Sequence, residues 1–465
     1  MTDIRQLLVC SANRRRFVFW LLFLPLFAAA CVPRGVRLPQ SPLLGTLERK
    51  SGRIAYVGID GNIYTINQGG GDRQAITDDA HFPERDSSDN TFLVYRLPVW
   101  SPDSKQLAYV RFSGDDGAIL ETGLHTAAPD GSASSVIHTG TQSYIYLFWS
   151  PDGRRLAFLN SGAGGPIRLQ VIAAVPEGEE GGEARILDVG QSVFWDWAPN
   201  GRQLVTHIDD PAIGPRLAIL SLEESVVEEV LDLEPGFFLA PDWSPDGTQL
   251  LVAAHDEGSG EVALTIVDRN GEVQSRPVII DSNSVVSFDW SPDGKKIAYI
   301  SSEGLSQTER GPLTVIDPQQ PEAAAVFSNS DNPVVTYFWS PDGKKIAYFT
   351  QRFIMPDSSE SEDGSQESGS SQNQIPILTP YVLDVETGES VQLTDPYVPT
   401  PQFLQVVAFF SQYQRSATIW SPDSENIVFS VVTASGQASI RVVSASGSLE
   451  PRTIADGVLA FWSWR

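Results

Sequence analysis

One ten-residue segment recurs along this chain and limits what the chain can fold into. Trp290-Ser-Pro-Asp-Gly-Lys-Lys-Ile-Ala-Tyr299 is repeated almost unchanged from Trp339 to Tyr348. In each copy an apolar strand ends on Trp, and Ser-Pro-Asp-Gly then forms a tight turn, because Pro fixes φ and Gly accepts the strained last position. A second strand follows at once. The segment therefore predicts a β-hairpin, and its recurrence predicts a fold of repeated hairpins.

Looser copies repeat the same unit at regular intervals. From Trp100 to Trp339 the repeat Trp residues are 46 to 49 residues apart, and steps of 81 and 44 residues then lead to the last two. The eight repeat residues are Trp100, Trp149, Trp197, Trp243, Trp290, Trp339, Trp420 and Trp464. A period in the forties with one hairpin per unit is typical of a β-propeller. Because every unit has its Trp, we expect these side chains to form the core between blades rather than a ligand-stacking ring.

The two ends of the chain each have half a repeat. Arg53–Val57 is a strand half with no Trp before it, and Phe461-Trp-Ser-Trp464 is a Trp half with no turn after it. Eight strand halves and eight Trp halves fit one ring if the C-terminal strand joins the N-terminal blade. We therefore expect an all-β fold, an eight-bladed β-propeller of four-stranded antiparallel blades over residues 51–465.

The repeat W-S-P-D-G-[KR]-x-[IL]-A-[YF] resembles that of the TolB-like, WD-repeat-like propellers of bacterial cell envelopes. The resemblance covers roughly residues 51–465. It implies that the Trp strand is the innermost strand of each blade. It departs from the Tol-system propeller in having eight repeat units where six are usual, so the resemblance is to a fold more than to a function.

The N-terminus has the pattern of a targeting segment. Arg14-Arg-Arg16 is followed by an apolar run and by Ala28-Ala-Ala-Cys31. This resembles a bacterial lipoprotein signal over residues 1–30, with Cys31 as the lipidation site and 31–50 as a flexible tether. A plain signal peptide and an uncleaved anchor are the alternatives. The expected location is the extracytoplasmic face of a bacterial membrane.

The charge of the chain limits its partners. Lys and Arg total 32 against 58 Asp and Glu, a formal net charge of −26. Such acidity disfavours nucleic acid and anionic lipid headgroups as main ligands and suits a well-solvated surface. With only two Cys, an exported mature form would hold no internal disulfide. We expect a monomer whose partner is an envelope protein or a small ligand.

The seventh unit is longer than the others, and two insertions account for its length. The first, at 355–376, holds the acidic, Ser-rich tract 357–374, which has no residues able to build a core. The second, at 397–415, has aromatic and aliphatic residues at spacings of three and four, an amphipathic helical pattern inside an all-β chain. A further long connection spans 78–90.

Strand order places all three irregular segments on one face of the ring, opposite the regular turns, if 397–415 and 78–90 connect successive blades. The sequence predicts a partner site there. The candidate residues are Phe403, Phe409, Phe410, Tyr413, Arg415, His81, Phe82 and Arg85. The alternative is that the segment 397–415 is a short helix that plugs the ring for stability.

No local catalytic motif is present in the sequence. G-x-S-x-G, H-E-x-x-H, G-x-x-x-x-G-K and C-x-x-C are all absent, and the five His residues have no metal-ligand spacing. We therefore expect no cofactor, no metal and no enzyme activity, and a membrane-tethered binding scaffold as the function. The alternative is a propeller hydrolase or lyase for glycan or peptide, with residues from several blades forming its site at the channel mouth.

Overall fold

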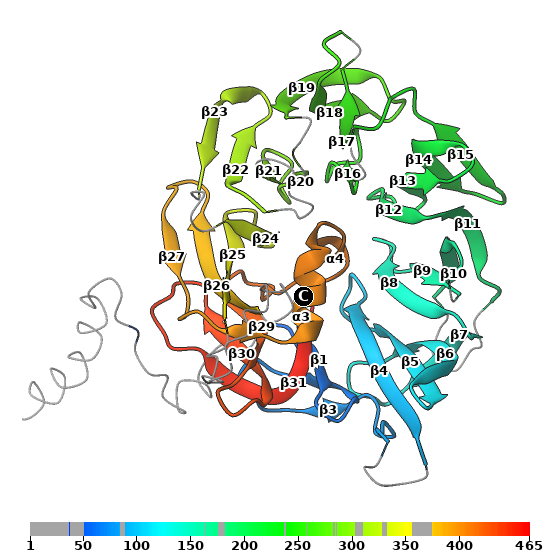
Figure 1. The fold of residues 1–465 in the computed structure, drawn as a ribbon, viewed down its shortest axis with the longest axis vertical. Helices are drawn as coiled ribbons and strands as arrows, with labels where there is room; N and C mark the ends of the chain where they lie inside the picture. Colours follow the sequence, from blue (N-terminus) through cyan, green and yellow to red (C-terminus); the bar gives the residue numbers. More distant parts are fainter. Residues whose placement is uncertain are drawn as a thin grey trace, which may run out of the picture.

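The computed structural model describes residue 37 and residues 51–83, 89–162, 164–174, 182–236, 239–256, 258–281, 284, 286–302, 310–327, 333–355 and 374–465. Cys31, Arg85 and residues 357–373 of the acidic tract lie outside this part of the chain. The described residues form antiparallel sheets arranged around a central axis (Figure 1).

Six of the sheets have four strands each, in chain order or its reverse, as expected of propeller blades. The first comprises β4 (Thr91–Trp100), β5 (Leu107–Asp115), β6 (Ala118–Ala127) and β7 (Ser134–Gly140), and the second β8 (Ser143–Trp149), β9 (Arg155–Ser161), β10 (Ile167–Ala173) and β11 (Arg185–Gly190). The third comprises β12 (Ser192–Trp197), β13 (Gln203–Asp210), β14 (Gly214–Leu222) and β15 (Val226–Val230), and the fourth β16 (Asp242–Trp243), β17 (Gln249–His255), β18 (Val262–Asp268) and β19 (Val273–Ile280). The fifth comprises β20 (Val286–Trp290), β21 (Ile297–Ser301), β22 (Leu313–Asp317) and β23 (Gln320–Val326), and the sixth β24 (Val334–Trp339), β25 (Lys345–Ile354), β26 (Ile375–Asp384) and β27 (Ser390–Gln392).

The seventh sheet joins the two ends of the chain. Its order is β28 (Val398–Pro399), β29 (Asn426–Val432), β30 (Ala438–Ser444), β31 (Arg452–Trp462), β1 (Ile54–Gly58), β2 (Ile63–Ile66) and β3 (Gln74–Ala75). The first half of β31 pairs with β30 and the second half with β1. The expected pairing of the C-terminal strand with Arg53–Val57 is therefore confirmed, with Ile54 opposite Trp462. The described chain forms seven sheets, and a count of eight blades requires the two halves of this sheet to be counted separately.

The Trp that closes the repeat is Trp462, so the expectation of Trp464 is wrong. In the other units the repeat Trp pairs with the first Leu or Ile of the next strand, as Trp290 does with Ile297, and Trp462 holds this place opposite Ile54. Ser463 then takes the part of the turn serine, since its Oγ accepts from the backbone N–H of Arg53. Trp464 is only partly buried. The segment Phe461-Trp-Ser-Trp464 has the same Phe-Trp-x-Trp pattern as Phe194-Trp-Asp-Trp197, whose second Trp is the repeat residue. This similarity favoured Trp464, two residues after the Trp that closes the ring.

The other repeat Trp side chains are buried, with at most 8% of their surface exposed. Four of them link neighbouring blades, because the indole Nε1 donates to the carbonyl of the residue that precedes the Trp of the previous unit. These bonds run from Trp100 to Phe461, Trp149 to Val99, Trp197 to Phe148 and Trp420 to Phe338, at 2.9 to 3.4 Å. Their place in the structure is inter-blade core.

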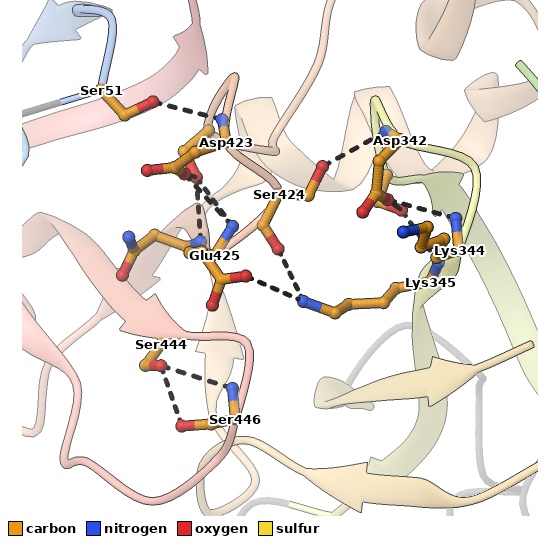
Figure 2. A network of polar contacts seen from close by, with 12 residues as sticks. Ser51, Asp342, Lys344, Lys345, Asp423, Ser424, Glu425, Ser444 and Ser446 are labelled. Atoms are coloured by element: carbon orange, nitrogen blue, oxygen red, sulfur yellow. Dashed lines mark hydrogen bonds and ion pairs between the residues drawn. The ribbon is translucent and has the colours of Figure 1, made fainter. Parts of the chain in front are cut away.

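The Ser-Pro-Asp-Gly turns are held by their own side chains and connected to one another along the rim. In the turn after Trp339, Ser340 Oγ donates to Asp342 Oδ1 at 2.6 Å, and Gly343 has a φ of +69°. Figure 2 shows the link to the next turn, where Lys345 Nζ contacts the Ser424 carbonyl at 3.0 Å and Glu425 at 3.3 Å. The turn Asp residues are thus used for structure, as Asx-type turns use them.

Two short helices interrupt the inner strand of the last unit. They are α3 (Pro401–Ala408) and α4 (Phe410–Ser416), and the Thr400 side chain caps the first. Val398 pairs with Val432 and Trp420 bridges to Ile427, both on the β29 side, so the residues between them leave the strand and return to it. The expected helix is confirmed. Its expected place as a connection between blades is wrong, because spacing along the sequence cannot distinguish an insertion before a strand from one inside it.

Candidate binding site

The helices α3 and α4 fill the centre of the ring (Figure 1). Phe403 packs edge-on against Phe349, with ring centroids 5.6 Å apart, and Phe410 packs against Tyr337 at 5.2 Å. Tyr413 packs against Tyr146, also at 5.2 Å. These rings come from β24, β25 and β8, on two sides of the channel. The segment is therefore a plug that joins distant blades.

The plug is also fixed by hydrogen bonds to the inner strands. The Gln412 side chain accepts from the Trp195 N–H at 3.2 Å and donates to the Trp195 carbonyl at 2.8 Å. Tyr146 donates to the Gln412 carbonyl at 2.7 Å. An innermost strand has one edge without a strand neighbour, so its N–H and C=O groups need such partners. The Gln412 amide supplies both, in place of a further strand.

The structure divides the predicted partner-binding residues into two groups. Phe403 and Phe410 have no exposed surface and Tyr413 has 6%, while the Arg415 side chain has 6%. These four residues are inside the ring, where a surface partner does not reach them. They therefore belong to the plug and do not form the expected partner surface. Phe409 is 53% exposed and Phe82 54%, and His81 is exposed as well.

Phe82 and the plug meet at a small apolar pocket, which we term the loop-face pocket. It has a volume of about 130 Å³ and is lined by parts of β1, β4 and β31, by Phe82 and by Gln402 and Gln405 of α3. Ile59, half exposed, is also part of its wall. Two of the three irregular segments expected on one face, 78–90 and 397–415, therefore meet at this pocket.

Leu97 in the wall of this pocket has an unusual backbone. Its φ is +57°, a conformation that a side chain of this size rarely adopts, and it lies where the register of β4 shifts between Arg96 and Val99. A bulge of this kind redirects a strand. Here it places Leu97 in the wall of the pocket.

A second pocket lies at the centre of the ring beside the repeat turns, and we term it the turn-face pocket. Its volume is about 450 Å³. Pro245, Pro292 and Pro341 of three successive turns contribute to its wall, together with Trp243, Trp290, Trp339 and Trp464. Its polar side chains are Asp242, Asp289, Gln414, Arg415 and Thr418. A pocket of this size is within the range of small-molecule sites.

The carboxyl groups of this region come from one position of the repeat. Asp196, Asp242 and Asp289 each precede the repeat Trp in three successive units, and all three are at most 9% exposed. Asp196 accepts from the Trp243 N–H at 2.9 Å, and Asp242 accepts from the Trp290 N–H at 2.6 Å. Asp289 instead accepts from the Tyr337 hydroxyl at 2.6 Å.

One guanidinium from the plug faces these carboxyl groups. Arg415 Nη2 is 3.6 Å from Asp242 Oδ1, and the same side chain donates to the carbonyls of Ala240 and Pro241. Burial lowers the pKa of Arg415, but the three carboxyl groups raise it further, so the net direction is upward. Three acids thus share one permanent cation.

The pKa values of the carboxyl groups follow from this shortage of positive charge. Burial raises the pKa of Asp242 although Arg415 lowers it, and burial also raises the pKa of Asp196. The pKa of Asp289 lies well above its usual range, first because of burial and next because of the nearby Asp242 charge. Its Tyr337 hydrogen bond and Arg415 act in the opposite direction but do not offset these effects.

Sequence reasoning missed these three Asp residues, although they leave a signal. Asp-Trp occurs at 196–197, 242–243 and 289–290, where the other units have Val, Phe or Ile before the Trp. A charged residue at a strand position that is otherwise apolar is a candidate for function. The contribution of Arg415 had no comparable signal, because it depends on how the plug folds into the ring.

Among the described residues, no three His, Cys, Asp or Glu side chains are grouped in a way that could hold a metal ion. Among the same residues, no helix has the length and apolar character needed to cross a membrane.

Comparison with known proteins supports the propeller assignment. No family model matches the chain. Over 125 residues it is 26% identical to the Tol-Pal system protein TolB of Xylella fastidiosa strain M12. The matched segment covers 26% of this chain and 27% of that protein. The fold is a TolB-like β-propeller. The chain spans about a quarter of the length of the curated relatives it matches.

Solved structures resemble this propeller only distantly. TolB from Acinetobacter baumannii is 14% identical with a TM-score of 0.36, over 73% of this chain and 77% of that one. The dihydro-heme d1 dehydrogenase NirN reaches 0.48 at 14% identity, over 94% and 78%. An oligogalacturonate lyase reaches 0.44 at 14% identity, over 86% and 99%. None of these three TM-scores reaches 0.5, and likeness at this level says nothing about activity.

Proposed function

We propose that this propeller is a membrane-tethered binding scaffold of the bacterial cell envelope, which binds a partner protein on the face with the loop-face pocket. The observation that carries the proposal is the apolar pocket formed where Phe82 meets the channel plug. Exposed Phe82 and Ile59 give this pocket an apolar rim. An apolar concave surface with aromatic residues at its edge is typical of protein-binding sites.

The plug makes this face suitable for recognition. The helices close the channel, so a partner would contact a packed surface rather than an open pore. Leu97 is held at positive φ in the wall of that pocket, and backbone strain of this kind is frequent at binding sites. A preformed surface lowers the entropy cost of binding.

The proposed envelope location depends on the N-terminal segment. Ala28-Ala-Ala-Cys31, after a basic and apolar leader, supports lipidation of Cys31 and tethering through residues 31–50. The short match to TolB, a Tol-Pal system protein, agrees with an envelope protein as the partner.

Site-specific photo-crosslinking in the native envelope tests the proposal. We expect a crosslinker at Phe82 to capture a discrete partner, and Ile59→Ser to reduce that capture at least about fivefold through loss of an apolar contact. A crosslinker at Ile213, which is 71% exposed in the turn between β13 and β14 and does not line this pocket, is the matched control. Equal capture of the same protein from both positions would contradict the proposal.

The turn-face pocket favours a second candidate, a hydrolase or lyase for glycan or peptide. Asp242 and Asp289 line that pocket together, and a carboxyl group whose pKa is raised can serve as a general acid. Turnover of a panel of glycans and peptides by the purified protein, abolished in Asp289→Asn, would support this activity. Absence of turnover on the panel would favour the scaffold.

A further inference from the structure

The turn-face pocket contains a buried acid without a counter-ion. Asp289 is 9% exposed and lines the pocket, and in the part of the chain that the structure describes it makes no ion pair. It accepts a hydrogen bond from the neutral Tyr337 hydroxyl at 2.6 Å. Asp242, by contrast, has Arg415 beside it. The pocket therefore has one carboxyl group that a cation from outside would complement.

The local field at Asp289 also favours a cation. The negative charge of Asp242 affects the pKa of Asp289 more strongly than the positive charge of Arg415 does. The whole chain has a net charge of −26, which raises the local concentration of cations near its surface. The excess of negative charge is thus present both in the pocket and over the molecule.

The walls of the pocket suit an organic cation better than a bare metal ion. Trp243, Trp290, Trp339 and Trp464 line it, and indole faces attract ammonium groups. The described residues do not bring together the three His, Cys, Asp or Glu ligands that a metal site needs. Apolar walls with a few polar groups are typical of sites for small organic molecules.

Unpaired donors and one unpaired acceptor among the lining residues favour a ligand that also has hydroxyl groups. Trp243 Nε1 and Trp290 Nε1 are buried without a hydrogen-bond partner, and so are both amide atoms of Gln414. Trp243 and Trp290 are 5% and 6% exposed. In four other units the equivalent indole donates to the preceding blade, so the links are missing where the pocket lies. A hydroxyl group can accept from an indole N–H and donate to a Gln oxygen.

We propose that the turn-face pocket binds an amino sugar or amino alcohol, with the protonated amine at Asp289 and the hydroxyl groups toward Trp243, Trp290 and Gln414. The ammonium–carboxylate contact replaces the missing counter-ion of Asp289. The hydroxyl groups accept from the unpaired N–H groups and donate to the Gln414 amide oxygen, and the C–H face of the ligand packs on indole and proline. The site is separate from the loop-face pocket and does not depend on the partner proposed there.

Four hexoses of similar shape test the charge requirement. We expect D-glucosamine to bind to the purified protein at least about tenfold more tightly than D-glucose or N-acetyl-D-glucosamine, because a buried charge-assisted contact is worth that much. D-Glucuronate should bind most weakly. Affinities are measured by isothermal titration calorimetry, with saturation-transfer NMR for weak binders. Equal affinity for glucose and glucosamine, or no binding of glucosamine, would overturn the proposal.

Asp289→Asn tests the residue, because asparagine keeps an acceptor for Tyr337 and removes the charge. We expect it to weaken glucosamine binding about tenfold or more and to change glucose binding less than about twofold. Asp196→Asn is the matched control, since Asp196 has the same repeat position but does not line the pocket. An unchanged glucosamine affinity in a folded Asp289→Asn protein, or an equal loss in Asp196→Asn, would also overturn it. If Asp289→Asn does not fold, Trp290→Phe, which removes the indole N–H, must weaken glucosamine binding.

Discussion

Replacing Gln412 with alanine tests whether the plug is a structural part of the ring. The variant removes an amide that accepts from the Trp195 N–H at 3.2 Å and donates to its carbonyl at 2.8 Å. Both backbone groups face the filled channel, where they have no other described side chain as partner.

The structure sets the size of the effect. A buried polar group left unsatisfied costs roughly 1–3 kcal/mol, so two such groups cost roughly 2–6 kcal/mol. We expect a loss of about 3 kcal/mol, because the space left by the shorter side chain is polar and can admit water to one of the groups. Such a loss is a large fraction of the stability of an ordinary domain.

Urea denaturation followed by circular dichroism and Trp fluorescence measures the change. The matched control is Gln405→Ala, which makes the same substitution at an exposed position of α3 and so includes the same change in helix propensity. Faster proteolysis within 401–416 in the Gln412→Ala protein should accompany the loss. Agreement of the two variants to within about 0.5 kcal/mol would refute the reasoning, because that is the scatter of ordinary surface substitutions.

Four further predictions follow from the fold and from the buried acids. Trp462→Ala should destabilise the protein by about 3–5 kcal/mol in denaturant, and Trp464→Ala by much less, because only Trp462 is fully buried. Equal losses would contradict the assignment of Trp462 as the closing repeat residue. A chain truncated after Gly457 should lose cooperative thermal unfolding, measured by calorimetry, because the pairing of β31 with β1 is removed; a melt like that of the full chain would reject ring closure. Burial and the Asp242 charge hold the pKa of Asp289 well above its usual range, so the protonated form stabilises the fold and this stability is lost as pH rises. Asp289→Asn should therefore raise Tm at pH 8 but not near pH 4, and a pH-independent difference would contradict this. Cys31→Ser should move the protein from the membrane fraction to the soluble one or leave the precursor uncleaved; mass spectrometry showing an unmodified mature N-terminus beyond Cys31 in the wild type would exclude lipidation.

Much of the fold could be predicted because the repeat is local. The turn, the strand after it and the Trp before it lie within ten residues, so the hairpin of Trp290–Tyr299 can be recognised from one short segment. Ring closure followed from the unmatched half-repeats at the two ends. The error at Trp464 arose because Phe461-Trp-Ser-Trp464 offers two tryptophans and only strand register selects between them.

The candidate sites could be predicted only in part. Spacing identified the helix at 397–415, but not that it leaves and re-enters one strand and turns into the channel, since this depends on the open edge at Trp195. For that reason Phe403, Phe410, Tyr413 and Arg415 were expected at a surface. The turn-face pocket brings Asp289 of β20 and Arg415 of α4 into one lining, an arrangement that arises only when the ring is closed around the plug.

The double pairing of β31 bears on when this protein can fold. Ile54 pairs with Ile66 on one side, but its partner on the other side is Trp462. A nascent chain therefore lacks the inner strand of its first unit until residue 462 has left the ribosome. The plug likewise needs Trp195 and Phe349 to be in place before it can dock. Contacts so distant in sequence form slowly. The ring therefore stays open throughout synthesis and can close only when the C-terminal strand β31 is available to pair with β1.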